Sequence, residues 1–131
     1  MRGVVVTARR ARSALIALAL AAGSALADLQ TLAPEQAGDH IGEHATVCGV
    51  VADAAYRADV NGAPTFLNFG GAHPRQVFTA LIWGEHRARF TSPPETHVGE
   101  SICVTGRVSA HRGKPQIVVD SPAQIVPGGP R

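Results

Sequence analysis

Small or polar residues alternate with β-branched residues over 44–57 (HATVCGVVADAAYR), which is the two-residue period of a β-strand. Gly49 within this run indicates a bulge or a bend. Four further strands are expected at 65–70, 76–84, 100–111 and 115–126. The hydrophobic pattern therefore predicts an all-β protein with five strands.

Helical structure is expected at only two places. Residues 31–42 (TLAPEQAGDHIG) predict a short N-terminal helix, with Thr31 as its cap, Pro34 in its first turn and Gly42 at its end. Residues 85–99 predict a short helical turn followed by a proline-rich connection between the third and fourth strands. The helices are thus minor elements beside the strands.

Tight turns are expected where glycine follows a turn-forming residue. Asn61-Gly62 lies between the first two strands, and residues 112–114 (RGK) separate the last two. Residues 127–131 (PGGPR) predict a flexible tail.

Two segments of the chain resemble each other. Residues 41–51 (IGEHATVCGVV) and 98–108 (VGESICVTGRV) align without gaps, and both lead from a loop into a strand. If these two strands pair antiparallel, Cys48 and Cys103 lie across from one another.

The N-terminus has the composition of a bacterial Sec-type signal peptide. Four arginines precede the apolar run 14–22, and Ala25-Leu26-Ala27 is a cleavage signal of the small-x-small kind. We therefore expect residues 1–27 to be removed, residues 28–126 to form one domain, and the protein to be periplasmic or secreted. The expected product spans no membrane.

Removal of the signal peptide changes the charge of the protein. The precursor has 12 basic and 10 acidic residues and a formal charge of +2. Without the four N-terminal arginines, eight basic residues remain against all ten acidic ones, so the charge becomes −2. A sequence-independent nucleic-acid binder usually has a clear basic excess, which is absent here.

The two cysteines, Cys48 and Cys103, predict a disulfide in an exported chain. The alternative is a pair of buried free thiols. A redox-active pair is not expected, because the Cys-x-x-Cys spacing is absent.

Residues 40–44 (HIGEH) match the His-x-x-Glu-His pattern of inverted zinc proteases. That motif requires a continuous helix, so that both histidines face one metal ion. Gly42 interrupts the motif, and His44 already belongs to the first strand. We interpret it as a helix end followed by a strand, with no metal site.

The order of these segments resembles a known family. IGEHATVCGVV, TFLNFGG, FTALIW, VGESICVTGRV and GKPQIVV together are similar to the small exported bacterial OB-fold domains of the nucleic-acid-binding type. The resemblance covers about residues 38 to 126. It implies a five-stranded barrel whose face on strands two and three, with the 1–2 and 4–5 loops, binds oligonucleotides or other ligands.

Candidate binding residues come from the segments that this fold brings to that face. Charged groups would contact phosphates, and a flat ring would stack on a base. We expect Arg57, Arg112 and Lys114 to contact phosphates and Tyr56 to stack on a base. The full candidate set is Tyr56, Arg57, Asn68, Arg75, His111, Arg112 and Lys114.

Several of these residue types have a purely structural alternative. The aromatic residues in apolar strands fit a core, and Tyr56 borders a turn. Arg112 and Lys114 fit a solvated turn, and Asn68 fits a residue that satisfies a buried backbone group. The aromatic residues concerned are Phe66, Phe69, Phe78 and Trp83.

Catalysis is not indicated by any motif, since no nucleophile elbow, carboxylate pair or phosphate-binding glycine loop is present. The six histidines lie on different loops and suggest no specific metal site or cofactor. The leading hypothesis is a non-enzymatic binding module for single-stranded nucleic acid. A protein- or small-ligand-binding module of an envelope assembly is the alternative, and a metal carrier is the third.

Overall fold

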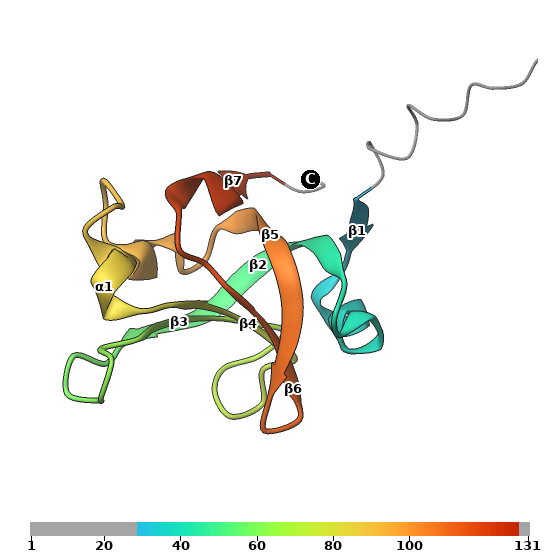
Figure 1. Ribbon diagram of the computed structural model, residues 1–131, viewed down its shortest axis with the longest axis horizontal. Coiled ribbons are helices and arrows are strands. Elements are labelled where there is room, and N and C mark those ends of the chain that lie inside the picture. Colours follow the sequence, from blue (N-terminus) through green and yellow to red (C-terminus); the bar gives the residue numbers. More distant parts are fainter. Residues whose placement is uncertain (1–28, 129–131) are drawn as a thin grey trace, which may run out of the picture.

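The computed structural model describes residues 29–128 and has a closed five-stranded barrel at its centre (Figure 1). The barrel strands pair in the order β2-β3-β4-β6-β5, and β5 pairs back with β2 to close the barrel. All these pairs are antiparallel except β4 with β6. The barrel strands are β2 (His44–Tyr56), β3 (Thr65–Phe69), β4 (Phe78–Ile82), β5 (Ser101–His111) and β6 (Lys114–Val118). The predicted five-stranded β-barrel is confirmed.

Short elements surround the barrel. Two three-residue strands extend the β2–β5 pair, with β1 parallel to β2 and β7 antiparallel to β5. A helical connection joins β4 to β5, as the sequence predicted. These elements are β1 (Gln30–Leu32), η2 (Pro34–His40), α1 (Gly84–Arg87), η3 (Pro94–His97), η4 (Pro122–Gln124) and β7 (Ile125–Pro127).

The N-terminal helix differs from the prediction for 31–42. It is the 3₁₀ helix η2, and Ala33 rather than Thr31 precedes it. Thr31 instead lies in β1 opposite Thr46, because burial of the neighbouring Leu32 anchors this segment against β2. The side chain of Gln36 accepts a hydrogen bond from the Ala33 amide (2.7 Å) at the start of the helix. The choice of Thr31 as the cap was therefore wrong.

The predicted strand over 115–126 is two strands. β6 ends at Val118, and β7 begins at Ile125 after the short helix η4. Ser121 caps this helix by accepting a hydrogen bond from the Ala123 amide (3.2 Å). Pro127, which was expected in a flexible tail, pairs with Ile102 as the last residue of β7.

Gly49 has a role other than the predicted bulge or bend. The irregularity of β2 lies between Val51 and Asp53, where the register with β3 shifts. At Gly49, an added Cβ atom would lie 2.7 Å from the Pro34 ring. Glycine is therefore needed here because helix η2 packs directly on the strand.

The interior of the barrel is filled by aliphatic residues and two phenylalanines. Phe69 and Phe78 are fully buried, and their ring centroids lie 5.3 Å apart. The other fully buried large side chains, from five strands and the segment after β6, are Leu67, Ile82, Ile102, Ile117, Val47, Val51, Val104, Val108 and Val119. Burial of this apolar surface is the main stabilising term of the fold.

The two similar sequence segments form equivalent structures. In each, a 3₁₀ helix ends at a histidine whose Nδ1 lies 2.8 Å from a glutamate three residues later. In each, the intervening glycine has a positive φ, 93° at Gly42 and 85° at Gly99. Gly42 donates to the Val108 carbonyl (2.7 Å), and Gly99 donates to the Val51 carbonyl (2.8 Å). The two halves are therefore related by a local pseudo-two-fold axis near the middle of the β2–β5 pair.

This pairing brings the two cysteines together. Cys48 lies directly opposite Cys103 in the β2–β5 register, their Cα atoms are 4.0 Å apart, and the two residues form a disulfide. The pseudo-symmetric position is occupied by Thr46 and Thr105, whose hydroxyls are hydrogen-bonded at 2.7 Å. The predicted disulfide is confirmed, and such a bond is typical of an oxidising compartment.

The predicted signal peptide, residues 1–27, and the last residues of the predicted tail, 129–131, lie outside the described residues. Within residues 29–128, no helix combines the length and the apolar character that crossing a membrane requires.

Candidate ligand-binding groove

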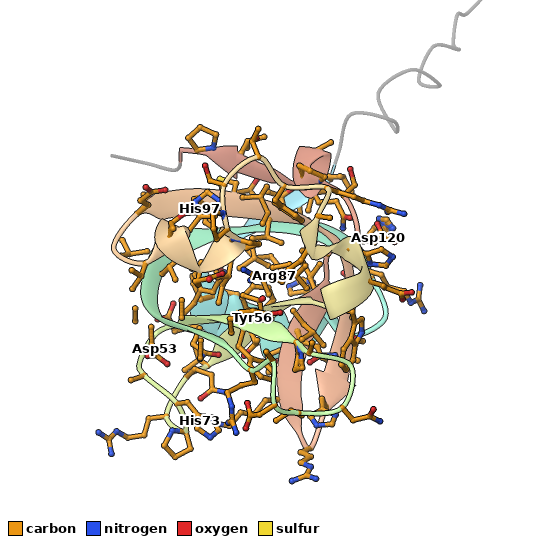
Figure 2. The ribbon with its side chains drawn as sticks, turned by 90° about the vertical axis from the view of Figure 1, so that its left-hand side faces the viewer. Asp53, Tyr56, His73, Arg87, His97 and Asp120 are labelled. Atoms are coloured by element: carbon orange, nitrogen blue, oxygen red, sulfur yellow. A yellow bond between two sulfur atoms is a disulfide. The ribbon has the colours of Figure 1, made fainter. Side chains whose placement is uncertain are left out.

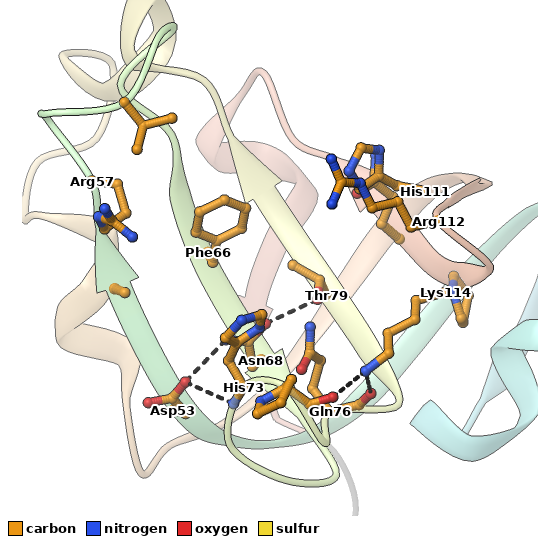
Figure 3. Close-up of a pocket in the computed structure, with 15 residues that line it drawn as sticks. Asp53, Arg57, Phe66, Asn68, His73, Gln76, Thr79, His111, Arg112 and Lys114 are labelled. Atoms are coloured by element: carbon orange, nitrogen blue, oxygen red, sulfur yellow. Dashed lines mark hydrogen bonds between the residues drawn. The ribbon is translucent and has the colours of Figure 1, made fainter.

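A groove of about 490 Å³ lies on the outer face of β3 and β4 (Figure 3). Its volume is within the range of small-ligand sites. The floor is built from side chains that point outward from neighbouring strands, opposite to the barrel interior. Ala55 and Phe66 form an apolar row, because they are register partners on β2 and β3.

Three connections form the walls of the groove. The loop 57–64 between β2 and β3 contributes Arg57 and Val60 on one side. The β5–β6 turn contributes His111 and Arg112 on the other side. The loop 70–77 closes one end with His73, Pro74 and Gln76. Figure 3 shows this closed end beside the polar part of the floor.

A row of polar side chains crosses the floor at the closed end. Asp53, Asn68, Thr79 and Gln116 are successive register partners on β2, β3, β4 and β6. Thr79 donates a hydrogen bond to Asn68 Oδ1 (2.9 Å), and Asn68 Nδ2 donates to Asp53 Oδ2 (3.0 Å). The amide of His73 also donates to Asp53 Oδ2, at 3.3 Å. From Thr79 to Asp53, the row is therefore a chain of hydrogen bonds.

Asp53 reaches the groove because of the irregularity in β2. Val51 lies in the core, so simple alternation would place residue 53 in the core too. The register shift between Val51 and Asp53 instead turns Ala54 toward the core and Asp53 outward. Sequence reasoning missed Asp53. The sequence did contain a signal for it, namely a charged residue at a strand position that alternation assigns to the core.

The side chains of the candidate cations in the groove differ in their hydrogen-bond partners. Arg57 donates two hydrogen bonds to Asp59 (3.0 and 2.8 Å), which raise the pKa of Arg57 and lower that of Asp59. The Lys114 ammonium donates to the backbone carbonyls of Pro74 and Gln76. Arg112 forms no salt bridge with another described residue and is exposed at the tip of its turn.

Lys114 therefore has a positioning role in this structure. Its two acceptors lie in the loop 70–77, so the side chain holds that loop against β6 (Figure 3). The Gln76 side-chain oxygen is buried and has no hydrogen-bond partner among the described residues. Three cations were expected to contact phosphates. Among them, only the Arg112 side chain forms no hydrogen bond or salt bridge with another described residue.

The structure brings five of the seven candidate residues into the groove: Arg57, Asn68, His111, Arg112 and Lys114. It leaves two outside. Arg75 is exposed on the loop 70–77 but does not line the groove. Tyr56 points elsewhere, and the Arg87 guanidinium carbon lies 3.5 Å from the centroid of its ring (Figure 2). One face of the Tyr56 ring is thus already covered by a cation.

The aromatic residue on the groove floor is Phe66, which is half-buried. Phe69 and Phe78 belong to the core, as the sequence suggested. Trp83 is 37% exposed and packs closely on the loop between β2 and β3. A Cβ atom added at Gly62 in that loop would lie only 2.9 Å from the Trp83 ring. Phe66 is therefore the ring that a groove ligand meets.

Arg87 connects the helical segment to the barrel beside the groove. Its guanidinium donates to Glu95 (2.6 and 3.3 Å) and to the Thr65 hydroxyl (2.8 Å), in addition to its contact with Tyr56. The hydrogen bond from Arg87 lowers the pKa of Glu95, and the Glu95 hydrogen bond raises the pKa of Arg87. The cluster stabilises the connection between β4 and β5.

Glu95→Gln is expected to lower the free energy of unfolding at pH 7 by about 1 kcal/mol, because a charged hydrogen bond is lost at a partly exposed site. The folded-state pKa of Glu95 is below its ordinary value of 4.5, so this stabilisation is present above that pH and disappears as the pH falls through the folded-state pKa. Denaturant unfolding of both proteins at pH 7, 5 and 3 measures it. A difference that persists unchanged at pH 3 would contradict this assignment.

Histidines and acidic residues do not gather into a metal site. Within residues 29–128, no group of three or more His, Cys, Asp or Glu side chains is arranged to hold a metal ion. In HIGEH, His40 ends η2 and is paired with Glu43, whereas His44 begins β2. The two histidines therefore do not lie on one helix.

Comparisons with known proteins show no family for this chain. No protein-family model matches the chain, and no curated protein matches it. Among solved structures, the chain is similar to a putative aspartyl-tRNA synthetase from Leishmania major Friedlin, with a TM-score of 0.46 and 10% identity. The likeness covers 80% of this chain and 22% of that chain. We draw no functional argument from a likeness of this size.

Proposed function

We propose that this protein is a non-enzymatic, exported binding module that holds a short single-stranded nucleic-acid segment in the groove. The observation that supports this proposal is the combination of a half-buried ring on the floor, Phe66, with an exposed arginine on the wall, Arg112, which forms no salt bridge with another described residue. A ring offers a stacking surface for any base, and an arginine binds backbone phosphate. Phe66 belongs to the barrel strand β3, and Arg112 lies in the turn that directly follows β5.

The arrangement suits a few nucleotides rather than a long strand. One aromatic ring on the floor provides one stacking position, and His111 and Arg112 stand together on the β5–β6 turn beside it. The electrostatic part of binding is small, because Arg57 and Lys114 already have internal partners. We therefore expect micromolar or weaker affinity at physiological salt.

Arg112→Ala is expected to weaken binding of a labelled single-stranded oligonucleotide and to reduce the slope of log K against log salt by about 0.7, the value for one phosphate contact. Lys114→Ala should leave that slope unchanged, because its ammonium is bound to carbonyls in the loop 70–77. Fluorescence anisotropy between about 20 and 200 mM salt measures both.

Lys114→Ala also serves as the matched control, since it removes one positive charge from the same turn. Equal slope changes in the two variants would mean that general charge, not the placement of Arg112, attracts the strand. Absence of oligonucleotide binding by the unmodified protein, even at the lowest salt, would refute the proposed function.

A second candidate is a binding module for an envelope protein or a small polar ligand. Asp53 favours it, because a carboxylate on the floor of the groove repels phosphate. The expected formal charge of −2 after export favours it as well. For such a ligand we expect binding that depends weakly on salt, which titration of a captured periplasmic partner would measure.

A further inference from the structure

The closed end of the groove contains a carboxylate that no phosphate-binding role explains. Asp53 forms no salt bridge with another described residue, although it lines the same groove as His111 and Arg112. A strand bound in this groove must therefore direct its phosphates toward the β5–β6 turn. The part of the strand that reaches Asp53 must carry hydrogen-bond donors, because an ionised carboxylate only accepts.

Asp53 is held in a defined orientation. Its Oδ2 atom accepts from Asn68 Nδ2 (3.0 Å) and from the His73 amide (3.3 Å), as Figure 3 shows. Asn68 is oriented in turn by the Thr79 hydroxyl, which donates to its oxygen at 2.9 Å and so directs its nitrogen toward Asp53. Asn68 is 3% exposed and Thr79 is 7% exposed, so packing limits their movement. This end of the floor is therefore preorganised.

The atoms that remain available for a ligand follow from this chain. Asp53 Oδ1 accepts no hydrogen bond from the described residues, whereas Oδ2 has two donors. The Asn68 nitrogen uses one of its two N–H groups on Asp53, so one N–H is left. The Asp53–Asn68 pair thus presents one acceptor and one donor side by side.

Phe66 places a stacked base next to this pair. Phe66 and Asn68 are two residues apart on β3 and point to the same face of the sheet, which separates them by about 7 Å. Ala55 and Asp53 are their register partners on β2. A base stacked on the Phe66 ring therefore lies beside Asp53 and Asn68, so that one of its edges can contact them.

We infer, building on the proposed function, that this end of the groove is a base-reading subsite that favours a base with an exocyclic amino group over thymine or uracil. Cytosine offers an amino donor beside the N3 acceptor, which matches Asp53 Oδ1 and the free Asn68 N–H. Thymine also offers a donor beside an acceptor, its N3–H beside O2 or O4, but its second carbonyl oxygen then lies beside the Asp53 carboxylate and is repelled by it. Acidic side chains accept from the cytosine amino group in the same way elsewhere.

The test compares short oligo-dC and oligo-dT, which differ little in size and carry equal charge. The unmodified protein is expected to bind oligo-dC about tenfold more tightly, the effect of one well-placed base contact. Asp53→Asn keeps an oxygen for Asn68 and the His73 amide but replaces Oδ1 with a donor NH₂ group. The preference should then disappear or reverse toward oligo-dT.

Asp59→Asn is the charge-matched control. This substitution also removes one negative charge beside the groove. It breaks the salt bridge between Arg57 and Asp59 and leaves the row of polar side chains on the groove floor unchanged. We expect it to strengthen binding of both oligonucleotides and to leave their ratio unchanged.

The outcomes separate the two proposals. Binding of both oligonucleotides with equal affinity, or an equal change of the ratio in Asp53→Asn and Asp59→Asn, would overturn the subsite and leave the proposed function intact. Failure of both oligonucleotides to bind at low salt would overturn both. Circular dichroism of Asp53→Asn checks that the barrel is folded, and Asp53→Ala, which removes the acceptor without adding a donor, should abolish the oligo-dC preference if Asp53→Asn does not fold.

Discussion

Replacing Cys48 and Cys103 together by alanine is expected to lower the free energy of unfolding by about 4 kcal/mol, because the disulfide closes a long loop in the unfolded chain. The cysteines are 55 residues apart in sequence, yet they lie opposite each other on β2 and β5. That strand pair closes the barrel, so loss of the disulfide removes the covalent link between the two ends of the sheet and leaves only their backbone pairing. Chemical denaturation followed by the fluorescence of Trp83, the single tryptophan of the chain, measures the effect.

The local pseudo-two-fold axis provides a matched control. Thr46 and Thr105 occupy the equivalent positions of the same strand pair and are joined by a hydrogen bond instead of a covalent bond. Replacing both by valine should cost about 1 kcal/mol or less, the net contribution of one hydrogen bond. Similar losses in the two double variants would show that the disulfide stabilises the protein no more than an ordinary cross-strand pair.

Phe69→Ala is expected to cost about 3–5 kcal/mol of stability, since it leaves a cavity at a fully buried ring position beside Phe78. Phe66→Ala, three residues earlier on the same strand, should be much less destabilising, because its ring faces the groove rather than the core. It should instead weaken oligonucleotide binding by roughly 1–3 kcal/mol, the contribution of one stacked base.

The two variants together test whether stability and binding belong to opposite faces of β3. Unfolding midpoints give the first quantity, and oligonucleotide titration of the folded protein gives the second. A Phe66→Ala variant that binds as well as the unmodified protein would show that the ring is not the stacking surface. In that case the groove would have to bind its ligand through the polar row alone.

Local sequence patterns were sufficient to predict an all-β protein, and the resemblance to the OB-fold family implied that the strands form a barrel. Alternation in β2 and apolar runs between turn residues located the strands, although β4 is buried at all five of its positions. The similarity of 41–51 and 98–108 also pointed to the Cys48–Cys103 pair, since two like segments pairing antiparallel place these residues opposite each other. Residues at element ends were harder, as Thr31 shows: pairing of β1 with β2 overrode its preference for a helix cap.

Tertiary contacts decided which residues form the groove. Arg57, Lys114 and Tyr56 have the side chains that a nucleic-acid site needs, but each has a partner elsewhere in the protein: Asp59, the backbone of the loop 70–77, and Arg87. Asp59 is close in sequence to Arg57. The partners of Lys114 and Tyr56 are distant in sequence, so no local pattern reveals them. A register shift within β2 turned Asp53 from an apparent core position to the groove. Strand periodicity is a local property of the backbone, whereas the availability of a charged side chain depends on every group that folding brings within hydrogen-bonding distance of it.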